Sequence, residues 1–256
     1  MSTQNEPSRL LSGMTSFVTG ASSGLGAHFA RLLADAGANV VIGARRKDKL
    51  EGLGENLTGS SGKILAIEMD VNDTASIGCI FDEVEAHGLN VDILVNNAGV
   101  NVVAPALEMT PDGYDQILNT NTKAPFFMAA EAARRMIARQ APGRIINIAS
   151  VAAMNVLPGA TAYCMSKSAM SMMSRGLARE WARYMINVNA ICPGYIETDI
   201  NEFWWKTDGG KKQMASFPRR RLAQASDLDG ALLMLAGPAG AGITGSSITV
   251  DDGQYI

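Results

Sequence analysis

Short runs of apolar, often β-branched residues alternate along the chain with longer stretches in which apolar positions recur at helical spacing. Most of the short runs are almost continuously apolar, as expected of parallel strands that are covered on both faces. The predicted strands are residues 16–18, 39–42, 64–68, 93–95, 145–148, 187–191 and 247–250. The predicted helices are residues 25–36, 48–57, 74–86, 111–139, 161–184 and 227–235. This alternation predicts an α/β fold with a doubly wound parallel sheet of about seven strands flanked by helices.

Two segments refine this outline. Thr110 is a good N-cap and precedes a proline, so we expect a helix to begin at Pro111. The least regular stretch is residues 200–224, which contains two adjacent tryptophans and two adjacent glycines. It lies between two predicted elements, so we expect an insertion over the carboxyl edge of the sheet. Because ligands bind at that edge in open α/β sheets, the insertion is predicted to be a substrate lid.

The composition narrows the class of protein. The chain has 256 residues, which suits one domain, and 47% of them are apolar and 18% charged, as in globular proteins. A net charge of −3 provides no basic field that would hold nucleic acid. No stretch approaches the roughly 20 apolar residues of a membrane span, and the polar residues 1–12 resemble neither a signal peptide nor a transit peptide. We therefore expect a cytoplasmic protein whose partner is a small molecule.

The cysteines and histidines bear on the redox compartment and on metal binding. The three cysteines, Cys79, Cys164 and Cys192, are an odd number at scattered spacing, which favours a reducing compartment over a disulfide framework. The two histidines, His28 and His87, have no cysteine or histidine near them at the spacing of metal ligands. No transition-metal site is predicted.

A glycine-rich loop follows the first strand and opens the first helix. It reads Thr19-Gly20-Ala21-Ser22-Ser23-Gly24-Leu25-Gly26. Glycines at these positions permit a tight turn and let the backbone approach a pyrophosphate, which rests on the helix N-terminus. A plain strand-to-helix turn is the structural alternative, but the order of strand, loop and helix favours a Rossmann-type dinucleotide site. The residues predicted to bind the cofactor here are Gly20, Ser22, Ser23, Gly24, Leu25 and Gly26.

The loop has the spacing Gly-x-x-x-Gly-x-Gly, and further motifs follow it in order. They are Asp70-Val71, Asn96-Asn97-Ala98-Gly99, Asn121, Ser150, Tyr163-Cys164-Met165-Ser166-Lys167 and Pro193-Gly194. With these motifs the chain resembles the short-chain dehydrogenase/reductase family, and the resemblance covers residues 14–253. It implies an enzyme that interconverts a ketone and a secondary alcohol by hydride transfer with a nicotinamide cofactor.

The resemblance also implies roles in cofactor binding. Asp70 and Val71 would contact the adenine. The segment from Asn96 to Gly99, which includes Asn97 and Ala98, would hold the fourth strand and form the floor of the cofactor site. A buried hydrogen-bond network that stabilises the sheet is the structural alternative for Asn96 and Asn97, and both functions are compatible. The residues that would frame the nicotinamide are Pro193, Gly194, Ile196 and Thr198.

Tyr163 and Lys167 are the residues predicted to perform the proton transfer. The ordinary pKa of tyrosine is about 10, so a pKa near 7 requires about 4 kcal/mol of preferential stabilisation of the phenolate. A cation about 4 Å away supplies about that much at an effective dielectric constant near 20. Lys167 lies four residues after Tyr163, so the two side chains share one face of a helix. We predict Tyr163 as general acid and base with Lys167 beside it, and the resemblance adds that Lys167 holds the nicotinamide ribose.

Two further polar residues complete the predicted catalytic set. Ser150 follows an apolar strand, so its hydroxyl is expected at the carboxyl edge of the sheet, where it would bond to the substrate oxygen as charge develops. Neither histidine stands in a motif that would activate Ser150 as a nucleophile. Asn121 would hold a water that links Lys167 to solvent, a role implied by the resemblance.

The residues after the second strand bear on the choice of cofactor. An acidic side chain at that strand end binds the ribose 2′-hydroxyl of NAD and repels a 2′-phosphate. Here Ala44 is followed by Arg45, Arg46 and Lys47. The alternative is that these bases only solvate a helix start, but cations oppose the dipole there, and Arg45 is suited to a phosphate. NADP(H) is therefore predicted over NAD(H), although Ser23 departs from the basic residue that many NADP-using relatives carry.

Several apolar side chains are candidates to line the substrate space: Met154, Val156, Leu157, Phe203, Trp204 and Trp205. Such a lining favours an apolar ketone or secondary alcohol. The alternative for the tryptophans is that they pack the lid against the body of the domain. Arg219, Arg220 and Arg221 raise the alternative of an acidic carrier protein, whereas Pro218 and Arg221 match a structural Pro-x-x-Arg pattern of the family.

Assembly and rival functions stay open at this point. A stripe at helical spacing follows the Tyr163 helix and is explained by core packing in most proteins: Met170, Met173, Leu177 and Trp181. The resemblance implies that this helix and the Asn121 helix pair across subunits of a homotetramer or homodimer.

The alternative enzyme functions are a 3-oxoacyl-thioester reductase and an NAD-linked alcohol or steroid dehydrogenase. A non-catalytic nucleotide-binding regulator is disfavoured because Tyr163 and Lys167 are both present.

Overall fold

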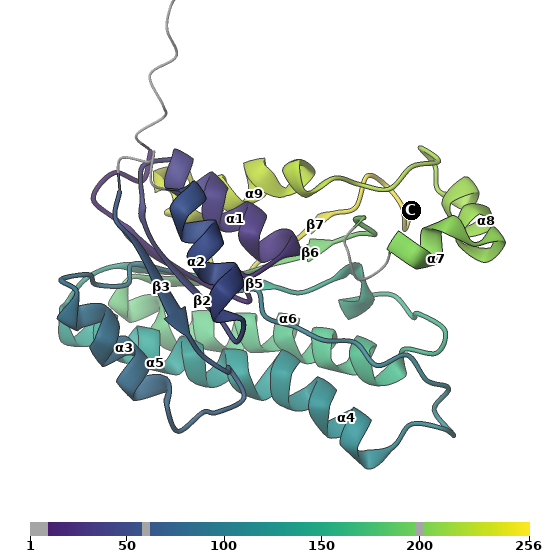
Figure 1. Cartoon of the computed structure of the whole chain (residues 1–256), viewed down its shortest axis with the longest axis horizontal. Coiled ribbons are helices and arrows are strands. Elements are labelled where there is room, and N and C mark those ends of the chain that lie inside the picture. The colour runs from purple at the N-terminus through teal and green to yellow at the C-terminus, as the bar shows by residue number, and fades with distance from the viewer. Residues whose placement is uncertain (1–9, 58–61, 198–201) are drawn as a thin grey trace, which may run out of the picture.

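Seven parallel strands form one sheet in the computed structural model of the chain, which describes residues 10–57, 62–197 and 202–256 (Figure 1). Their order across the sheet is β3-β2-β1-β4-β5-β6-β7. The strands are β1 (Thr15–Thr19), β2 (Asn39–Ala44), β3 (Ile64–Glu68), β4 (Ile93–Asn96), β5 (Gly143–Ile148), β6 (Ile186–Pro193) and β7 (Ser247–Val250). The predicted single-domain, doubly wound parallel sheet is confirmed.

Helices cover both faces of the sheet, as Figure 1 shows. One layer contains α1 (Gly24–Asp35), α2 (Lys47–Asn56) and α9 (Asp229–Ala236). The other contains α3 (Ile77–Ala86), α4 (Pro111–Leu118), α5 (Ala124–Ala138) and α6 (Thr161–Trp181). Two short helices, α7 (Glu202–Lys206) and α8 (Asp208–Ser216), lie beyond one end of the sheet. Within the described residues, no helix combines the length and apolar character that a membrane crossing requires.

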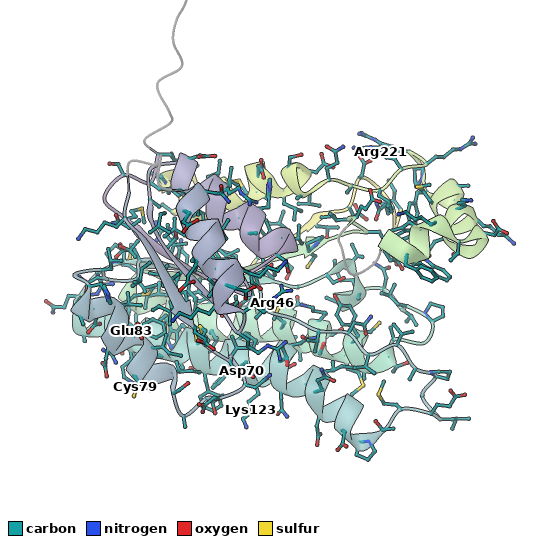
Figure 2. The ribbon with its side chains drawn as sticks, in the orientation of Figure 1. Arg46, Asp70, Cys79, Glu83, Lys123 and Arg221 are labelled. Atoms are coloured by element: carbon teal, nitrogen blue, oxygen red, sulfur yellow. The ribbon has the colours of Figure 1, made fainter. Side chains whose placement is uncertain are left out.

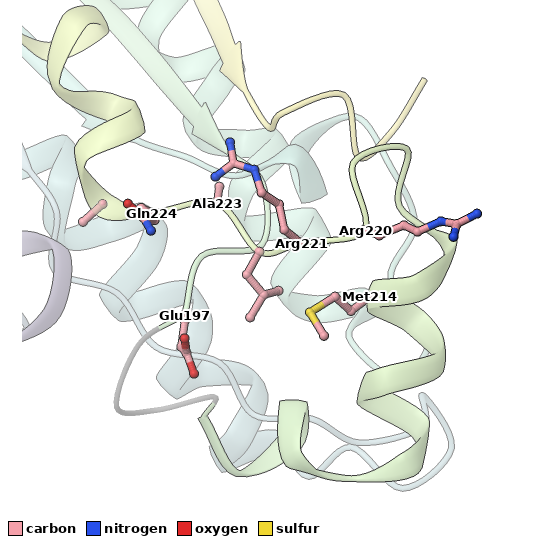
Figure 3. Close-up of a pocket in the computed structure, with 8 residues that line it drawn as sticks. Glu197, Met214, Arg220, Arg221, Ala223 and Gln224 are labelled. Atoms are coloured by element: carbon pink, nitrogen blue, oxygen red, sulfur yellow. The ribbon is translucent and has the colours of Figure 1, made fainter.

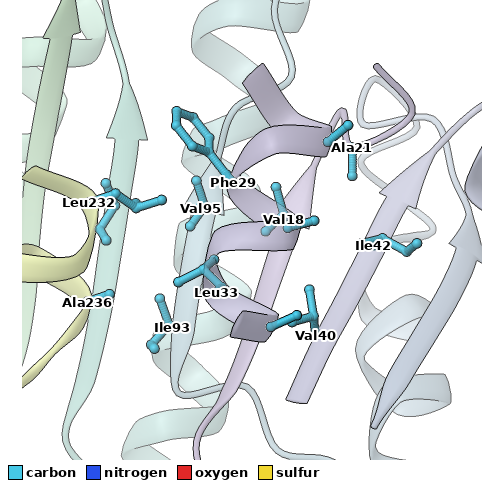
Figure 4. Packing of buried hydrophobic residues seen from close by; sticks show 14 of the residues in the cluster. Val18, Ala21, Phe29, Leu33, Val40, Ile42, Ile93, Val95, Leu232 and Ala236 are labelled. Atoms are coloured by element: carbon cyan, nitrogen blue, oxygen red, sulfur yellow. The ribbon is translucent and has the colours of Figure 1, made fainter. Parts of the chain in front are cut away.

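The core explains the continuously apolar strands. Consecutive side chains of a strand point to opposite faces of the sheet, so a sheet covered on both faces needs apolar residues at every position. Val18 of β1 and Ile42 of β2 pack with Leu33 of α1 in one core cluster (Figure 4). The neighbouring Phe17 and Val41 belong to the cluster on the other face. Both layers of helices are thus held by the same strands.

One helix prediction is wrong, because the helix is interrupted in its middle. Residues 111–139 were expected to form one helix, but α4 and α5 are separated by a turn of π-helix, Asn119–Lys123. The predicted start is confirmed, because Thr110 Oγ1 accepts a hydrogen bond of 3.1 Å from the Gly113 N–H and Pro111 occupies the first turn. Turns of π-helix occur often at functional sites. This one contains Asn121.

The boundaries of three other predicted segments change. The helix expected at residues 74–86 begins at Ile77, and the helix expected at 161–184 ends at Trp181, followed by a 3₁₀ turn. The segment 200–224 was expected to be irregular, but it contains the helices α7 and α8 and is irregular only from Phe217 onward; residues 200–201 lie outside the described residues. Thr207 caps α8 through a 3.1 Å bond from the Gly210 N–H. At Gly210 a Cβ would collide with the Trp204 carbonyl oxygen, so glycine lets α7 and α8 pack closely.

Candidate active site

The glycine loop folds tightly between β1 and α1. Gly20 has φ +67° and Gly24 has φ +55°, which is the left-handed region that favours glycine. At Gly26 a Cβ would collide with the Gly20 carbonyl oxygen, so this position also requires glycine. Leu25 lies beside Gly24 in the first turn of α1. The glycines therefore let the loop turn tightly into the N-terminus of α1, whose backbone N–H groups are suited to a phosphate.

The end of β4 is bonded to this loop. Asn97 Nδ2 donates to the carbonyl oxygens of Thr19 (2.9 Å) and Gly20 (3.4 Å). In return, Thr19 Oγ1 accepts the backbone N–H groups of Asn97 (3.0 Å) and Ala98 (3.1 Å). No role was predicted for Thr19 from the sequence, although its position directly before the first glycine of the loop could have indicated one. These four bonds hold together two segments that the sequence predicts to bind the cofactor.

Asn96 belongs to a separate buried network. Its Nδ2 donates to Asn147 Oδ1 (2.9 Å) and to the Pro125 carbonyl (3.1 Å). Asn147 Nδ2 donates to Ser174 Oγ (2.8 Å), which itself donates to the Met170 carbonyl (2.9 Å). This chain of bonds ties β4 and β5 to α5 and α6. The contacts of Asn96 therefore support the structural alternative, a buried hydrogen-bond network that stabilises the sheet.

The basic segment after β2 meets the glycine loop through Arg46 rather than Arg45. Both arginines are exposed, but Arg46 Nη2 donates to Ser22 Oγ and to Ser23 Oγ, both at 2.8 Å. Figure 2 shows Arg46 and Asp70 projecting from the loops that follow β2 and β3. Asp70 Oδ1 accepts a 2.9 Å bond from the Asn72 N–H, and the neighbouring Val71 is buried. From the sequence, Arg45 was preferred as the residue that binds a 2′-phosphate because it directly follows the end of the second strand.

Ser150, Tyr163 and Lys167 are brought together at the carboxyl edge of the sheet. Ser150 and Tyr163 share a side-chain hydrogen bond, and Ser150 Oγ also accepts a 3.1 Å bond from the Ala152 N–H. Lys167 Nζ lies 5.7 Å from the centre of the Tyr163 ring. It donates a 2.8 Å hydrogen bond to the carbonyl of Ile148, at the end of β5. Residues from β5 and α6 thus converge as the sequence predicted.

Burial sets the direction of two pKa shifts. Desolvation raises the pKa of Tyr163, and the hydrogen bond with Ser150 opposes this only in part. The direction is opposite to the lowering that the sequence argument expected from Lys167, because desolvation of the buried phenol is the largest effect on its pKa. Burial lowers the pKa of Lys167 to about 8, and the nearby Cys192 thiol acts in the opposite sense. Tyr163 is therefore a protonated phenol at neutral pH, next to a lysine with a pKa of about 8.

Asn121 is buried in the π-helical turn and bonded on both sides of its amide. Oδ1 accepts the Val100 N–H at 2.9 Å, and Nδ2 donates to the Val100 carbonyl at 2.8 Å and to Ser166 Oγ at 3.0 Å. The position that a Cβ of Gly99 would occupy lies 3.3 Å from Asn121 Oδ1 and 3.5 Å from Lys167 Nζ. Oxygen and ammonium therefore face the same small space beside Gly99.

The segment after β6 is held by the C-terminal residues. Pro193 ends the strand, and Gly194 N–H donates to the Val250 carbonyl at 3.0 Å. At Gly194 a Cβ would collide with Gln254 Oε1. Ile196 is buried and pairs with Ala223 as a single parallel bridge. Thr198, the last residue predicted to frame the nicotinamide, lies outside the described residues.

The two tryptophans of the predicted lid have different environments. Trp205 is 6% exposed and packs edge-on against Tyr195, with ring centres 5.2 Å apart. Tyr195 also stacks on Phe217 at 5.6 Å and on Tyr255 at 6.1 Å. Trp204 is 47% exposed and bonds through Nε1 to Gln213 within the lid. The packing alternative therefore applies to Trp205, and Trp204 stays at the surface.

Two of the three consecutive arginines, Arg219 and Arg221, are engaged in ion pairs on the body of the domain. Arg219 Nη1 and Arg221 Nε lie 2.9 Å and 2.8 Å from the two carboxylate oxygens of Asp252. A hollow of about 400 Å³ adjoins them, lined by Glu197, Met214, Arg220, Arg221, Leu222, Ala223, Gln224 and Ala225 (Figure 3). Tyr163 and Lys167 do not line it. These contacts support the structural interpretation of Arg221.

Exposed side chains of the segment between Ser150 and Tyr163, and of the segment after β4, form what we call the apolar rim. Met154 and Val156 are exposed in the segment that joins β5 to α6, and Leu157 is half-buried. The Ala104 N–H donates to the Gly159 carbonyl at 2.9 Å, so this segment is bonded to the one that follows β4, in which Val103 is exposed. The segments that follow β4 and β5 thus present apolar side chains to solvent.

The methionine stripe of α6 faces the core of the same chain. All four of its members pack against buried residues: Met170, Met173, Leu177 and Trp181. Other faces of the two helices carry exposed apolar side chains. Phe126 and Phe127 of α5 form an edge-on pair with ring centres 5.4 Å apart, and Met172 of α6 is exposed.

Comparison with known proteins gives the family. Residues 15–209 match the family described as short chain dehydrogenase. The chain is 35% identical over 244 residues to the 2-dehydro-3-deoxy-D-gluconate 5-dehydrogenase of Dickeya dadantii, covering 95% of this chain and 96% of the relative. It is 32% identical over 249 residues to a 3-oxoacyl-acyl-carrier-protein reductase of Rickettsia bellii, covering 96% and 98%.

A solved structure agrees with these relatives. The crystal structure of a gluconate 5-dehydrogenase from Burkholderia cenocepacia, in complex with NADP and tartrate, superimposes with a TM-score of 0.91 at 34% identity and covers 97% of each chain. The protein belongs to the short-chain dehydrogenase/reductase family. It is an NAD(P)-dependent oxidoreductase that acts on CH–OH groups and the corresponding ketones.

Proposed function

We propose that the protein is an NADP(H)-dependent ketoreductase in which Tyr163 donates the proton to the substrate oxygen. The observation that carries this proposal is the meeting of Tyr163, Ser150 and Lys167 at the sheet edge onto which the glycine loop also opens. When bound, the nicotinamide cofactor supplies the hydride. The protein's own residues then orient the carbonyl, provide the proton and replace it.

The hydroxyls of Ser150 and Tyr163 bond to the carbonyl oxygen of the ketone. As hydride reaches the carbonyl carbon, negative charge grows on that oxygen, and the two donors stabilise it. Tyr163 transfers its proton to the oxygen, which completes the alcohol and leaves a phenolate. The raised pKa of Tyr163 suits this direction, because the phenol keeps its proton until the oxygen becomes basic.

Lys167 and Asn121 restore the proton. The Lys167 ammonium stabilises the phenolate by charge, and we assign it the nicotinamide ribose as well. Asn121 Oδ1 and Lys167 Nζ both face the space beside Gly99, which suits a water that passes protons between Lys167 and solvent. In this proposal Asn121 acts through its oxygen, because both N–H groups of its amide are already bonded.

The proposed cofactor site continues along the carboxyl edge of the sheet. Asp70 and Val71 take the adenine, the segment from Asn97 to Gly99 forms the floor, and the residues from Pro193 to Thr198 frame the nicotinamide. Arg46, held at 2.8 Å by Ser22 and Ser23, and the exposed Arg45 receive the 2′-phosphate. The absence of a carboxylate at the end of β2 supports NADP(H) over NAD(H).

For the substrate we propose an apolar ketone or secondary alcohol, taken up under a lid formed by residues 200–224. The exposed apolar rim of Val103, Met154 and Val156 supports this choice. A second candidate is a sugar acid, since gluconate-related names recur among the relatives. The carrier-protein substrate of the 3-oxoacyl reductases is less well supported, because Arg219 and Arg221 are already paired with Asp252.

We further propose a homotetramer or homodimer in the cytoplasm. The exposed Phe126, Phe127 and Met172 support pairing through α5 and α6. Free thiols at Cys79 and Cys192 favour a reducing compartment. Light scattering on the wild type and on Phe126→Glu tests the assembly: a smaller particle is expected for the variant, and an unchanged mass would contradict pairing at this face.

The main test is a substrate screen that follows NADPH absorbance with apolar ketones, and NADP⁺ reduction with gluconate. Turnover of the ketones with a kcat/KM at least about tenfold above that for gluconate is expected, and the reverse ratio would favour the sugar-acid function. Tyr163→Phe is the control, because it removes only the proton donor. More than about a tenth of wild-type kcat in that variant would exclude Tyr163 as general acid.

Paired variants test the cofactor site. Arg45→Asp and Arg46→Asp each replace a charged contact worth about 1.5–3 kcal/mol with repulsion, so the ratio of kcat/KM for NADPH to that for NADH should fall at least about tenfold. Comparing the two variants shows which guanidinium binds the phosphate. If the wild type prefers NADH, the NADP assignment is wrong.

A further inference from the structure

Ser166 has a fully buried hydroxyl that joins two parts of the proposed site. Its Oγ donates a 2.7 Å hydrogen bond to the carbonyl of Tyr163 and accepts a 3.0 Å bond from Asn121 Nδ2. A second contact joins the π-helical turn to α6, because Thr122 Oγ1 donates to the Ser166 carbonyl at 3.5 Å. The π-helical turn is therefore bonded to α6 beside Tyr163 and one residue before Lys167.

These bonds, together with those to the Val100 backbone, determine which way the Asn121 amide faces. The Ser166 hydroxyl has one proton, and it is given to the Tyr163 carbonyl, so Ser166 meets Asn121 only as an acceptor. Only the NH₂ end of the amide fits that contact. Asn121 Oδ1 is then directed to the Val100 N–H, and it borders the space beside Gly99 that Lys167 Nζ also borders.

We propose that Ser166 is a positioning residue for the reaction: its hydroxyl fixes the Asn121 amide and the π-helical turn relative to Tyr163 and Lys167. This inference rests on the proposed function. Ser166 does not touch the reacting atoms in this account. It acts through Asn121, by keeping the amide oxygen at the proton-relay space and by holding the distance between that space and the Lys167 ammonium.

Ser174 provides a matched control on the same helix. It is also fully buried, donates to the Met170 carbonyl at 2.9 Å and accepts an asparagine Nδ2, that of Asn147, at 2.8 Å. The bonding pattern is the same, but its asparagine belongs to the network between the strands and not to the π-helical turn. Ser166→Ala and Ser174→Ala therefore remove equivalent buried hydrogen bonds, and only the first touches the proposed relay.

The experiment compares both variants in steady-state ketone reduction and in thermal unfolding. We expect similar losses in Tm, whereas kcat falls about tenfold in Ser166→Ala and stays within about twofold of wild type in Ser174→Ala, with KM for NADPH unchanged in both. Equal kcat values in the two variants would overturn the proposal. If Ser166→Ala does not fold, Ser166→Cys, whose thiol bonds weakly, takes its place with the same expectations.

A double-mutant cycle with Asn121→Ala shows whether Ser166 acts through that residue. Adding Ser166→Ala to Asn121→Ala should change kcat by less than about twofold, because the residue to be positioned is already gone. A further tenfold loss would mean that Ser166 acts elsewhere, and the inference would be wrong. Tyr163→Phe in the same assay separates a failure of the proposed function from a failure of this inference. If Tyr163→Phe keeps its activity, the proposed function fails. If Tyr163→Phe is inactive while Ser166→Ala has normal activity, only the inference about Ser166 fails.

Discussion

The ammonium group of Lys167 is buried, and this burial has a measurable effect on folding. The side chain is 4% exposed, and its pKa falls from the ordinary 10.5 to about 8. Each pH unit corresponds to about 1.4 kcal/mol, so the charged lysine opposes folding by about 3 kcal/mol at neutral pH. Replacement of Lys167 by methionine removes the charge and keeps an unbranched chain of similar length.

The sign of the pH dependence follows from the two pKa values. Between about pH 8 and 10.5 the unfolded chain binds more protons at Lys167 than the folded chain does, so the stability of the wild type rises with pH in that window. Lys167→Met has no such contribution. Relative to the variant, the wild type should gain about 2 kcal/mol between pH 7 and pH 9.5. The hydrogen bond lost at the Ile148 carbonyl is independent of pH, so the comparison between the two pH values removes it.

Urea unfolding of both proteins at pH 7 and pH 9.5, at one protein concentration, measures this difference. The concentration is fixed because subunit association would otherwise contribute to the stability. Other tyrosines and lysines titrate in both proteins and cancel. A difference between wild type and Lys167→Met that does not change with pH would refute the argument, because it would mean that Lys167 keeps its ordinary pKa in the folded protein.

Three further outcomes are expected. The kcat/KM for ketone reduction should fall as pH rises above about 8, because Lys167 loses its charge; a constant rate to pH 9.5 would exclude that dependence. Gly26→Ala should lower both the Tm and the affinity for NADPH, since its Cβ collides with a loop carbonyl, whereas Gly52→Ala in α2, where nothing lies within 4 Å, should raise the Tm; equal effects would contradict the packing argument. Arg221→Ala should lower the Tm more than Arg220→Ala, because Arg221 pairs with the nearly buried Asp252; differential scanning fluorimetry ranks the two.

Much of the fold follows from local pattern. Strand positions were predicted to within two residues at each end, because parallel strands buried on both faces must be continuously apolar. The glycine loop and the four-residue spacing of Tyr163 and Lys167 also lie within short segments, where the geometry of a turn or a helix decides which atoms meet. The start of α4 at Pro111 was predictable for the same reason, from its own N-cap.

The errors arose where distant segments act on local geometry. The helix expected at 111–139 is interrupted at Asn121, whose amide bonds to Val100 and Ser166 and so holds a π-helical turn that no helical propensity specifies. The lid was expected to be irregular, yet Thr207 and a close glycine contact give it two helices.

The sequence by itself determined the class of fold, the family and the residues that make up the proposed site, because these depend on residue types in order along the chain. Only the tertiary structure decided how those residues meet. It brought Arg46 rather than Arg45 to the serines of the glycine loop, buried Trp205 and left Trp204 at the surface. It also lowered the pKa of Lys167 and raised that of Tyr163. The reason is that burial, orientation and desolvation depend on neighbours that are remote in the sequence.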